Sequence, residues 1–470
     1  MTAAEHDLRQ LAARGPIHFV GIGGAGMCAL AELLARKGVT VSGCDVKRSP
    51  TFRVLEELGV SLHVGHAPDH VDGVAALVVT SAVPADHPEL TRARSLGIPV
   101  LKRAEALGSW VDSGTVVGVA GTHGKTTTTA MTTEILVAAG REPTGLVGGR
   151  VTGWAGNLRA GSDALFVVEA DEYDRSFLTL RPDVAVITNV EADHLDVYGD
   201  LEGVREGFRA FLRGVKNGGR IVVCADDHGA ASVLPEFAAS GYTYGTKAGA
   251  MLRAYDVEAR EGRIRCRVTE DGVDRGVLEL PVPGRHNLLN ALGAAAAARG
   301  LGVPWSPIVD ALAGFSGVGR RFERLGTVGG VTVIDDYAHH PTEIAATVEG
   351  IRGAFPGRRL VAAFQPHLYS RTRDFAREFG RALAGADEIW VTDVFPAREE
   401  PIPGVSGETV VDAARAAGAA AVHSHPRLET LAATLASTLR EGDVLVTMGA
   451  GSIEDSGRQV LEHLKEGAHA

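Results

Sequence analysis

The stretch "GVAGTHGKTTTTA", residues 118–130, has the form of a strand that enters a glycine-rich turn and continues into a helix. Small residues let several backbone N–H groups point at phosphate oxygens, while Lys125 offers a positive charge and Thr126 a hydroxyl group for Mg²⁺. The usual P-loop has a glycine five residues before its Gly-Lys pair, where this chain has Val119. We predict a shortened loop that binds a nucleoside triphosphate through Gly121, Thr122, His123, Gly124, Lys125, Thr126 and Thr127.

A second phosphate cradle lies about a hundred residues earlier, in "FVGIGGAGMCAL" at residues 19–30. Its glycines follow an apolar run, precede a helical pattern, and are followed by an acid at the end of the next expected strand. Backbone amides at such a helix start bind a diphosphate, and the acid accepts a hydrogen bond from a ribose hydroxyl. NAD and a UDP-sugar fit equally, and a turn that serves only packing is the alternative. The predicted residues are Gly21, Gly23, Gly24, Gly26 and Asp45.

Composition narrows the classes of function. The chain has 47 Lys and Arg against 58 Asp and Glu, a net charge of −11, which argues against nucleic acid as a partner. Its four cysteines form neither a CxxC pair nor a zinc spacing, as expected in a reducing cytosol. The N-terminus MTAAEHDLRQ lacks a signal-peptide pattern, and no uncharged apolar run is long enough for a membrane span. We therefore expect a cytoplasmic protein without a membrane partner.

The 470 residues exceed a single core, and short apolar runs alternate with helical patterns along the chain. Such alternation predicts parallel sheets with right-handed crossovers. We predict three consecutive α/β domains. A Rossmann-like domain spans 1–113, and a P-loop ATPase-like domain with a small antiparallel addition at 251–282 spans 114–325. A second Rossmann-like domain spans 326–470. Expected strands include Ile17–Val20, Val39–Gly43, Ala75–Val79, Thr115–Ala120, Ala164–Glu169, Val184–Thr188, Arg220–Cys224, Val331–Ile334, Leu360–Phe364, Glu388–Thr392 and Val444–Thr447.

Acidic residues follow two strands of the central domain, in "VVEADEYD" and "TNVEADHLD". The carboxyl ends of parallel strands share one sheet edge, so Glu169 and His194 are expected beside Thr126 as metal ligands. A histidine is a less usual Mg²⁺ ligand than a carboxylate. Taken alone, each of Glu169, Asp171, Glu172, Asp193 and His194 would more often be a solvated loop residue, and the position after the two strands that follow the P-loop favours a site for Glu169 and His194.

Together with GTHGKT and these two segments, "GRHNLLNALGA", "GRRFERLG" and "DDYAHHPTEI" resemble the Mur ligase family over nearly the whole chain. Members are ATP-dependent enzymes that form amide bonds in peptidoglycan synthesis. The resemblance implies that the first cradle holds the UDP of UDP-N-acetylmuramate and that the central loop holds ATP with Mg²⁺. The implied acceptor is L-alanine, which would attack an acyl phosphate; a sibling ligase using another amino acid or a peptide is the alternative. A monomer or weak dimer is expected.

The resemblance also implies roles for individual residues. Lys125, His194 and Arg321 would be catalytic: Lys125 at the β- and γ-phosphates, His194 at a second metal, Arg321 at the transferring phosphoryl group. Thr126 and Glu169 would bind the first Mg²⁺. Asn287, Asn290 and Asp336 would contact the nucleotide, and Tyr337, His339 and Arg371 would surround the amino acid. Three alternatives stay open: the asparagines could cap their helix, Arg320 could replace Arg321, and His339 or His340 could cap the helix beginning at Pro341.

Some positions depart from the family pattern, and two other functions fit parts of the sequence. Tyr173 and Leu368 differ from many relatives, and "LEGVREGFRAFLRG" offers no lysine for a carbamylated metal ligand. An NAD-dependent oxidoreductase leaves the GTHGKT loop unexplained, and a non-catalytic nucleotide switch needs no acceptor site. We expect the third domain to close on the second through a hinge at 324–330, "RLGTVGG"; a hairpin turn is the alternative for these glycines.

Overall fold

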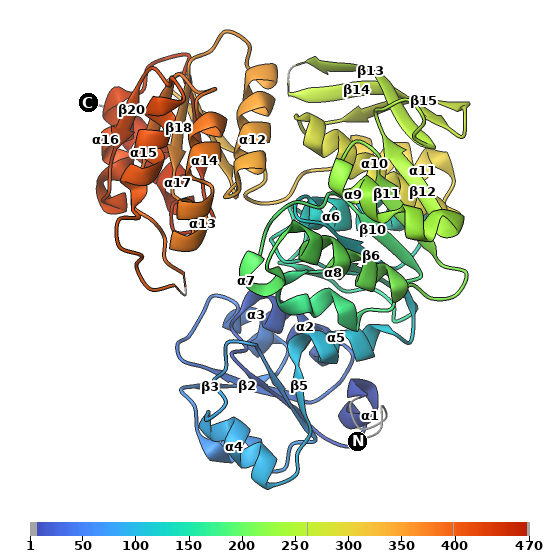
Figure 1. Cartoon of the computed structure of the whole chain (residues 1–470). Coiled ribbons are helices and arrows are strands. Elements are labelled where there is room, and N and C mark those ends of the chain that lie inside the picture. Colours follow the sequence, from blue (N-terminus) through green and yellow to red (C-terminus); the bar gives the residue numbers. More distant parts are fainter. Residues whose placement is uncertain (1–6, 261, 398, 468–470) are drawn as a thin grey trace. The chain divides into compact units, whose positions relative to one another are not determined.

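The computed structural model describes residues 7–260, 262–397 and 399–467 (Figure 1). The first six residues, on which the N-terminal interpretation partly rests, lie outside this part. The chain forms two compact units. One comprises the residues up to 255 with 268–276 and 289–312, and the other comprises 256–267, 277–288 and the residues from 313 onward. Each contains parallel sheet covered by helices, which confirms the predicted α/β class.

The N-terminal sheet has the order β3-β2-β1-β4-β5, and all of its strand pairs are parallel. The order reverses at β1, so the crevice beyond the carboxyl end of β1 is the expected ligand position in such a sheet. Strand β1 is buried along its length. The elements are α1 Leu8–Ala12, β1 Ile17–Val20, α2 Ala25–Arg36, β2 Val41–Asp45, α3 Phe52–Glu57, β3 Ser61–Val64, η2 Pro68–Val71, β4 Ala76–Val79, α4 Pro88–Ser95, β5 Val100–Lys102 and α5 Arg103–Val111.

The central sheet has ten strands in the order β15-β14-β13-β12-β11-β10-β6-β9-β7-β8. Strand β6 lies between β10 and β9 and is parallel to both, so the three carboxyl ends meet at one edge. The elements are β6 Thr115–Ala120, α6 Lys125–Ala138, β7 Thr144–Leu146, β8 Leu158–Arg159, β9 Leu165–Glu169, η3 Tyr173–Thr179, β10 Val184–Ile187, α7 Leu195–Tyr198, α8 Leu201–Arg213, β11 Arg220–Cys224, α9 His228–Val233, η4 Pro235–Ser240 and β12 Gly241–Gly245.

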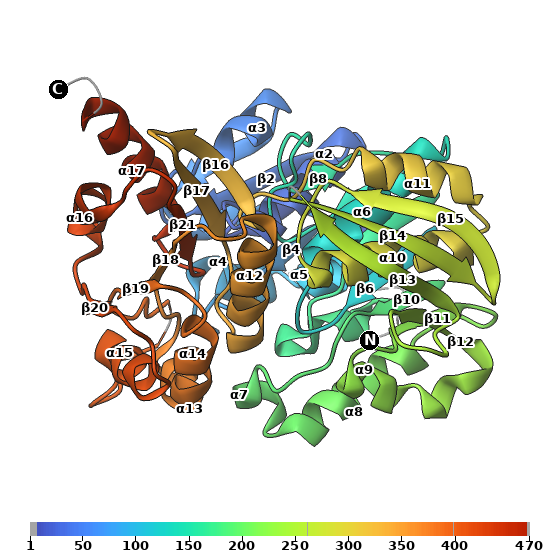
Figure 2. The same cartoon turned by 90° about the horizontal axis from the view of Figure 1, so that it is seen from above.

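The predicted antiparallel addition is present as β13 Leu252–Arg260, β14 Arg263–Glu270 and β15 Val273–Leu280. These three long strands lie side by side at one end of the sheet (Figure 2). Alternate residues of β14 are buried and exposed, the pattern of a sheet with one face covered. Helices α10 Arg285–Gly300 and α11 Trp305–Ala313 follow.

The third sheet has the order β16-β17-β21-β18-β19-β20, in which only the β16–β17 pair among the described pairings is antiparallel. Its core is apolar on both faces of the parallel strands. The elements are β16 Glu323–Val328, β17 Val331–Asp336, α12 Pro341–Ala354, β18 Leu360–Phe364, α13 Tyr369–Asp374, α14 Ala376–Leu383, β19 Glu388–Val391, α15 Gly407–Ala416, β20 Val422–Ser424, η5 Leu428–Thr430, α16 Leu431–Thr438, β21 Val444–Met448 and α17 Glu454–Gly467.

The expected hinge at 324–330 is wrong. Strands β16 and β17 pair from Glu323↔Asp335 to Val328↔Val331, so this segment is hydrogen-bonded within the third sheet. Gly329 and Gly330 both have positive φ, as a two-residue hairpin turn requires. These glycines therefore form a hairpin turn between β16 and β17, which was the alternative to a hinge.

None of the described helices has the length and apolar character that a membrane crossing requires.

Close helix packing in the C-terminal unit gives a test of the fold. A side chain at Gly380 in α14 would collide with the Ala413 backbone of α15, whereas one at Gly353 in α12 would meet no atom within 4 Å. Overpacking costs about 1–3 kcal/mol, while replacing an open helical glycine gains up to about 1 kcal/mol. We expect Gly380→Ala to lower the urea midpoint of this unit and Gly353→Ala to maintain or raise it. Equal midpoints for the two variants would contradict this packing.

Candidate active site

The loop between β6 and α6 lies in close contact with its surroundings. Gly121 and Gly124 have φ of +142° and +78°. A side chain at Gly121 would collide with the Thr188 hydroxyl, and one at Gly124 with the Asn290 amide. The backbone N–H of Thr122 donates to the Asn189 carbonyl at 3.1 Å. The loop is thus fixed against the end of β10, and the first turn of α6 directs its N–H groups beyond the sheet edge, as anion binding requires.

Lys125 begins α6 and turns back over this loop. Its Nζ donates to the carboxylate of Glu172 at 2.7 and 2.9 Å and to the carbonyl of Gly121 at 2.7 Å. The side chains of Lys125 and Glu172 are only 14% and 3% exposed. Burial raises the pKa of Glu172 to about 7, although the Lys125 ammonium opposes that shift. Burial is the largest influence on Lys125 and would lower its pKa, but the carboxylates of Glu172, Asp171 and Glu169 together outweigh it and raise that pKa, so the ammonium stays charged.

Glu172 is a residue whose importance sequence reasoning missed. It fitted a solvated loop acid, yet it is buried and is the principal partner of Lys125. The only signal in the sequence was its place in the acidic segment after β9.

The predicted metal ligands are only partly brought together. The Thr126 hydroxyl donates to Oε1 of Glu169 at 3.0 Å, and Oε2 of Glu169 accepts from the Gly148 N–H at 2.5 Å. Nε2 of His194 lies 3.9 Å from Oε1 of Glu172 and has no contact with Glu169 among those described. A hydroxyl and a carboxylate oxygen side by side fit Mg²⁺, which prefers oxygen ligands. The metal roles of Thr126, Glu169 and His194 stay predictions.

The two asparagines of α10 have different surroundings. The Thr128 hydroxyl donates to Oδ1 of Asn290 at 3.3 Å, so Asn290 packs on the first turn of α6. Nδ2 of Asn287 donates to the Pro283 carbonyl at 2.7 Å, which links the helix to the segment before it but is not an N-cap, since a cap side chain accepts from a helix N–H. The structure therefore places Asn290 beside the phosphate loop, and nucleotide contacts by either residue stay predictions.

The first cradle has the predicted form. The turn after β1 brings Gly23 to Asp45, whose Oδ2 accepts from the Gly23 N–H at 2.9 Å. Two residues that sequence reasoning missed line the same turn: Ser49 lies against Gly23, and the Arg103 side chain lies against Gly26. Arg103 follows β5 directly, so its approach depends on strand order, which the sequence does not show. Its guanidinium suits a diphosphate.

A cavity of about 200 Å³ lies in the first unit, between the helix that begins at the β1 cradle and the carboxylate that accepts from Thr126. Gly26 and Arg103 line it from the N-terminal sheet, and Gly148, Glu169 and Asp171 line it from the central sheet. A substrate whose diphosphate occupied the first cradle would therefore extend toward the carboxylates beside Thr126.

The third sheet contains the expected acceptor residues after β17. Asp336 accepts hydrogen bonds from the N–H groups of Phe322 and Ala338 at 2.9 and 2.8 Å. Burial raises its pKa to about 6, although Arg321 opposes the shift. Nδ1 of His339 lies 2.9 Å from the Tyr337 carbonyl. Burial lowers the pKa of His339 to about 3, so this imidazole is neutral at physiological pH.

Arg371 and Glu343 lie near the residues that follow β17. Arg371 in α13 is buried, with Nη1 3.4 Å from Nδ1 of His367, whose ring lies 5.8 Å from that of His339. Glu343 accepts from the N–H groups of His339 and His340 at 3.0 and 3.3 Å. His340 is the N-cap residue of α12, so it is the histidine that precedes the helix, as the capping alternative expected.

The adjacent arginines are distinguished by their partners. Arg320 is bound within the C-terminal unit, where its guanidinium contacts Asp335, Glu454 and the Gly449 carbonyl at 2.6–2.9 Å. Arg321 pairs with Glu343 at 3.1 Å; both guanidinium groups lie over the Tyr337 ring, at 5.0 and 5.1 Å, so the Glu343 pair is what distinguishes Arg321. Arg320 and Phe322, on either side of it, have positive φ, a strained conformation for such residues. The geometry favours Arg321 as the arginine directed toward the acceptor residues.

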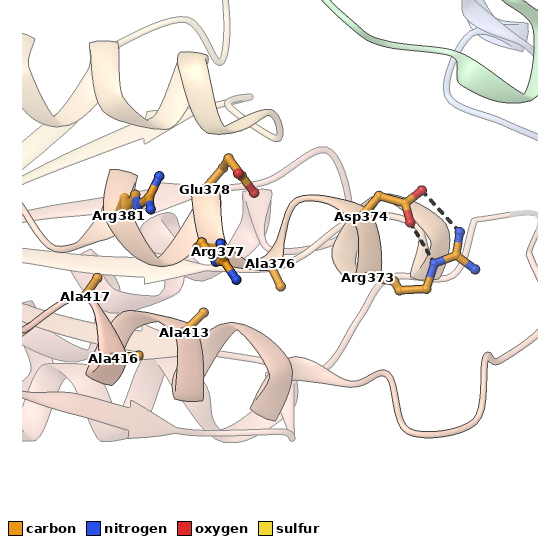
Figure 3. A pocket seen from close by; sticks show the side chains of 9 residues that line it. All are labelled: Arg373, Asp374, Ala376, Arg377, Glu378, Arg381, Ala413, Ala416 and Ala417. Carbon is orange, nitrogen blue, oxygen red and sulfur yellow. Dashed lines mark hydrogen bonds and ion pairs between the residues drawn. The ribbon is translucent and has the colours of Figure 1, made fainter. Parts of the chain in front are cut away.

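A hollow of about 660 Å³ in the same unit contains none of the predicted site residues (Figure 3). It lies along α13, α14 and α15, and the Arg373–Asp374 ion pair is at one end. It is a surface groove between helices, separate from the acceptor residues.

Three family models cover the chain in order. They are the Mur ligase family catalytic domain at 16–114, the Mur ligase middle domain at 119–298 and the Mur ligase glutamate ligase domain at 320–451. A UDP-N-acetylmuramate–L-alanine ligase of Renibacterium salmoninarum is 46% identical over 453 residues, 96% of each chain. The chain belongs to the Mur ligase family.

Other Mur ligases agree in sequence and in fold. The enzyme of the same name from Streptomyces avermitilis is 43% identical, over 96% of this chain and 97% of its own. The crystal structure of the Thermotoga maritima UDP-N-acetylmuramate–alanine ligase superposes with a TM-score of 0.81 at 30% identity, over 96% and 99% of the two chains. A murein peptide ligase from Psychrobacter arcticus superposes with a TM-score of 0.68 at 27% identity, over 96% and 98%.

The buried Glu172 gives a pH prediction. Its folded pKa of about 7 lies above the ordinary 4.5, so the folded chain binds more protons between these values and loses stability as pH rises. We expect the free energy of unfolding of the wild type to fall relative to that of Glu172→Gln between pH 5 and pH 7, by at most about 1.4 kcal/mol per pH unit, and the melting temperature to fall with it.

Glu202→Gln is the matched control, because Arg209 and Arg205 hold the pKa of Glu202 below its ordinary value and its titration lies beneath this window. A melting difference between the wild type and Glu172→Gln that is flat or rises with pH would contradict the assignment.

Proposed function

We propose that this Mur ligase joins L-alanine to the carboxylate of UDP-N-acetylmuramate with the cleavage of ATP. The observation that carries the proposal is a cavity of the first unit that is lined by Gly26 and Arg103, beside the β1 cradle, and by Glu169, which accepts from the Thr126 hydroxyl. A UDP-sugar that bears a carboxylate suits this path, because its diphosphate and its reacting group occupy opposite ends. The names of the full-length relatives support the same substrates.

The reaction needs activation of the carboxylate. A carboxylate does not react with an amine, because oxide would have to leave. Transfer of the γ-phosphoryl group gives an acyl phosphate; the amine adds to its carbonyl carbon, and phosphate leaves as the amide forms. Catalysis of phosphoryl transfer consists mostly of positioning and charge neutralisation.

The residues of the first unit supply these requirements. Lys125 would exchange the Glu172 carboxylate for the β- and γ-phosphate oxygens, since both positions offer negative charge to the same ammonium. Thr126 and Glu169, with His194, would hold Mg²⁺, which supplies neutralising charge when bound. The N–H groups of the loop would bind the phosphates without any need for further cations, which suits an acidic chain.

The residues of the second unit suit the amino acid. Arg371 is buried and would pair with the carboxylate of L-alanine. Nδ1 of His339 donates to the Tyr337 carbonyl when it carries the proton, leaving Nε2 to accept a hydrogen bond from the amino group. Because its pKa is low, His339 would orient the amine as a neutral acceptor.

The test is a phosphate-release assay with UDP-N-acetylmuramate, ATP and a panel of acceptors. We expect release with L-alanine to exceed release with glycine, L-serine or the tripeptide L-alanyl-γ-D-glutamyl-meso-diaminopimelate. Preference for the tripeptide would instead establish a peptide-adding ligase, the activity that the name of the Psychrobacter arcticus murein peptide ligase indicates for that protein. NADH formation without phosphate release would overturn both.

The variant Lys125→Ala tests whether the two phosphate cradles act independently. Removing a fixed charge at the transferring phosphoryl group should lower turnover at least ~10³-fold. Binding of UDP-N-acetylmuramate, measured by calorimetry, should remain close to that of the wild type because its diphosphate occupies the β1 cradle. Lys247→Ala, an exposed lysine of the same unit, should leave both measurements unchanged. Loss of UDP-N-acetylmuramate binding in Lys125→Ala would contradict the separate cradles.

A further inference from the structure

A buried group of metal-ligating side chains lies in the N-terminal sheet, outside both phosphate sites. It consists of His18 of β1, Cys44 of β2, His70 of η2 and Glu89 of α4. One ligand atom from each lies within 4.8 Å of every other. His18, Cys44 and Glu89 are buried, and the side chain of His70 is 15% exposed, so His70 on η2 is the most accessible of the four.

The strand register explains how residues distant in sequence meet. His18 is paired with Ser42 and Val20 with Cys44, so His18 and Cys44 lie on the same face of neighbouring strands, because alternate residues share a face. Helix α4 brings the Glu89 carboxylate to this face, and η2 brings the His70 ring. No spacing rule finds such a group, because each ligand comes from a different element.

The Glu89 carboxylate is the centre of the group. Its oxygens lie 3.2 Å from Nε2 of His18, 3.0 Å from Nδ1 of His70 and 3.1 Å from Sγ of Cys44. Three potential ligand atoms thus surround the carboxylate on different sides. A small cation bound among the four would replace these hydrogen bonds with shorter coordinate bonds.

We propose that His18, Cys44, His70 and Glu89 bind one Zn²⁺ ion as a structural site. Two imidazole nitrogens, a thiolate and a carboxylate oxygen are all common zinc ligands, and four protein ligands make a closed tetrahedral site. The charges also balance: the thiolate and the carboxylate carry two negative charges, and the ion carries two positive charges. Burying a neutral site costs less free energy than burying the same groups with a net charge.

The groups around the ligands fit the same role. Nδ1 of His18 lies 2.8 Å from the Ser42 hydroxyl, and the Ala67 N–H donates to Oε1 of Glu89 at 3.1 Å. Zinc-ligating histidines commonly use their second nitrogen in this way, which fixes the ring and leaves the other nitrogen for the metal.

Three further histidines lie around the group, and the ring of His63 stacks on that of His70 at 4.3 Å. Nδ1 of His66 is 3.1 Å from Sγ of Cys44, and the ring of His87 packs edge-on against His66. His87 is buried, and neither of its ring nitrogens has a hydrogen-bond partner. His66 thus brings a further imidazole nitrogen to the thiol of the group, and His87 packs behind it.

The site would act on the substrate cradle through the fold. Strand β1 leads into Gly21, and Cys44 immediately precedes Asp45, which caps the cradle at Gly23. An ion bound by β1, β2, η2 and α4 would tie together the elements that position this turn. Zinc is therefore expected to stabilise the N-terminal domain and to take no part in the transfer reaction.

The test is a Co²⁺ titration of the metal-depleted full-length chain in excess Mg²⁺, which occupies oxygen-rich sites. We expect one Co²⁺ per chain, with a thiolate-to-cobalt charge-transfer band in the near ultraviolet and strong visible bands typical of tetrahedral coordination. One equivalent of Zn²⁺ should abolish these bands and raise the melting temperature of the metal-depleted chain.

Variants identify the ligands. Cys44→Ser should remove the charge-transfer band, and His70→Gln, at the accessible side, should weaken Co²⁺ binding strongly while retaining the fold. Ser42→Ala should weaken binding about 10–100-fold, as loss of a second hydrogen-bonded partner does. Cys28→Ser, a buried cysteine outside the group, should bind Co²⁺ like the wild type.

The proposal is overturned if the wild type shows no thiolate band, or if the band persists in Cys44→Ser. It is also overturned if His70→Gln binds Co²⁺ as tightly as the wild type. If Cys44→Ser fails to fold, the wild-type spectrum and the Co²⁺ affinity of His70→Gln still test the proposal. These measurements do not involve turnover, so they are independent of the proposed ligase activity.

Discussion

The close approach of the 121–124 loop to β10 and α10 is the constraint on which the centre of this Mur ligase depends. Without side chains at Gly121 and Gly124, the loop packs against Thr188 and Asn290. That packing fixes where α6 begins, and so where Lys125 and Thr126 project. The parallel neighbours β9 and β10 then bring Glu169 and His194 to the same sheet edge. A wider loop would separate the ammonium from the carboxylates that surround it.

Three cations of the candidate site residues and their neighbours are paired with carboxylates inside the protein. Lys125 contacts Glu172, Arg321 contacts Glu343, and Arg320 contacts Asp335. An acidic chain thereby keeps its important cations in place without exposing them to unrelated anions. An incoming phosphate or carboxylate must displace an internal carboxylate, so only a ligand with several well-placed contacts gains enough free energy to bind. Selectivity for polyanionic substrates thus arises from competition inside the protein.

Much of this arrangement could be predicted from sequence, because it depends on local patterns and on parallel topology. The two glycine turns, the start of α6 and the acids after β9 each follow from a strand–turn–helix unit, and the structure places Thr126 beside Glu169 as expected. What could not be predicted depends on distant pairing. Burial of Glu172, the approach of Arg103 to Gly26 and the pairing of β16 with β17 are set by strand order and register. The group of His18, Cys44, His70 and Glu89 could not be predicted for the same reason.

The packing of the 121–124 loop has a consequence for inhibition. A compound that gained its affinity from the backbone N–H groups of this loop would contact atoms that every substitution except proline retains. The usual route to resistance is a side chain that obstructs the inhibitor, yet any side chain at Gly121 or Gly124 would first strike Thr188 or Asn290 and disturb the loop itself. Escape from such a compound would have to arise elsewhere, through altered uptake, increased expression or changes distant from the contact.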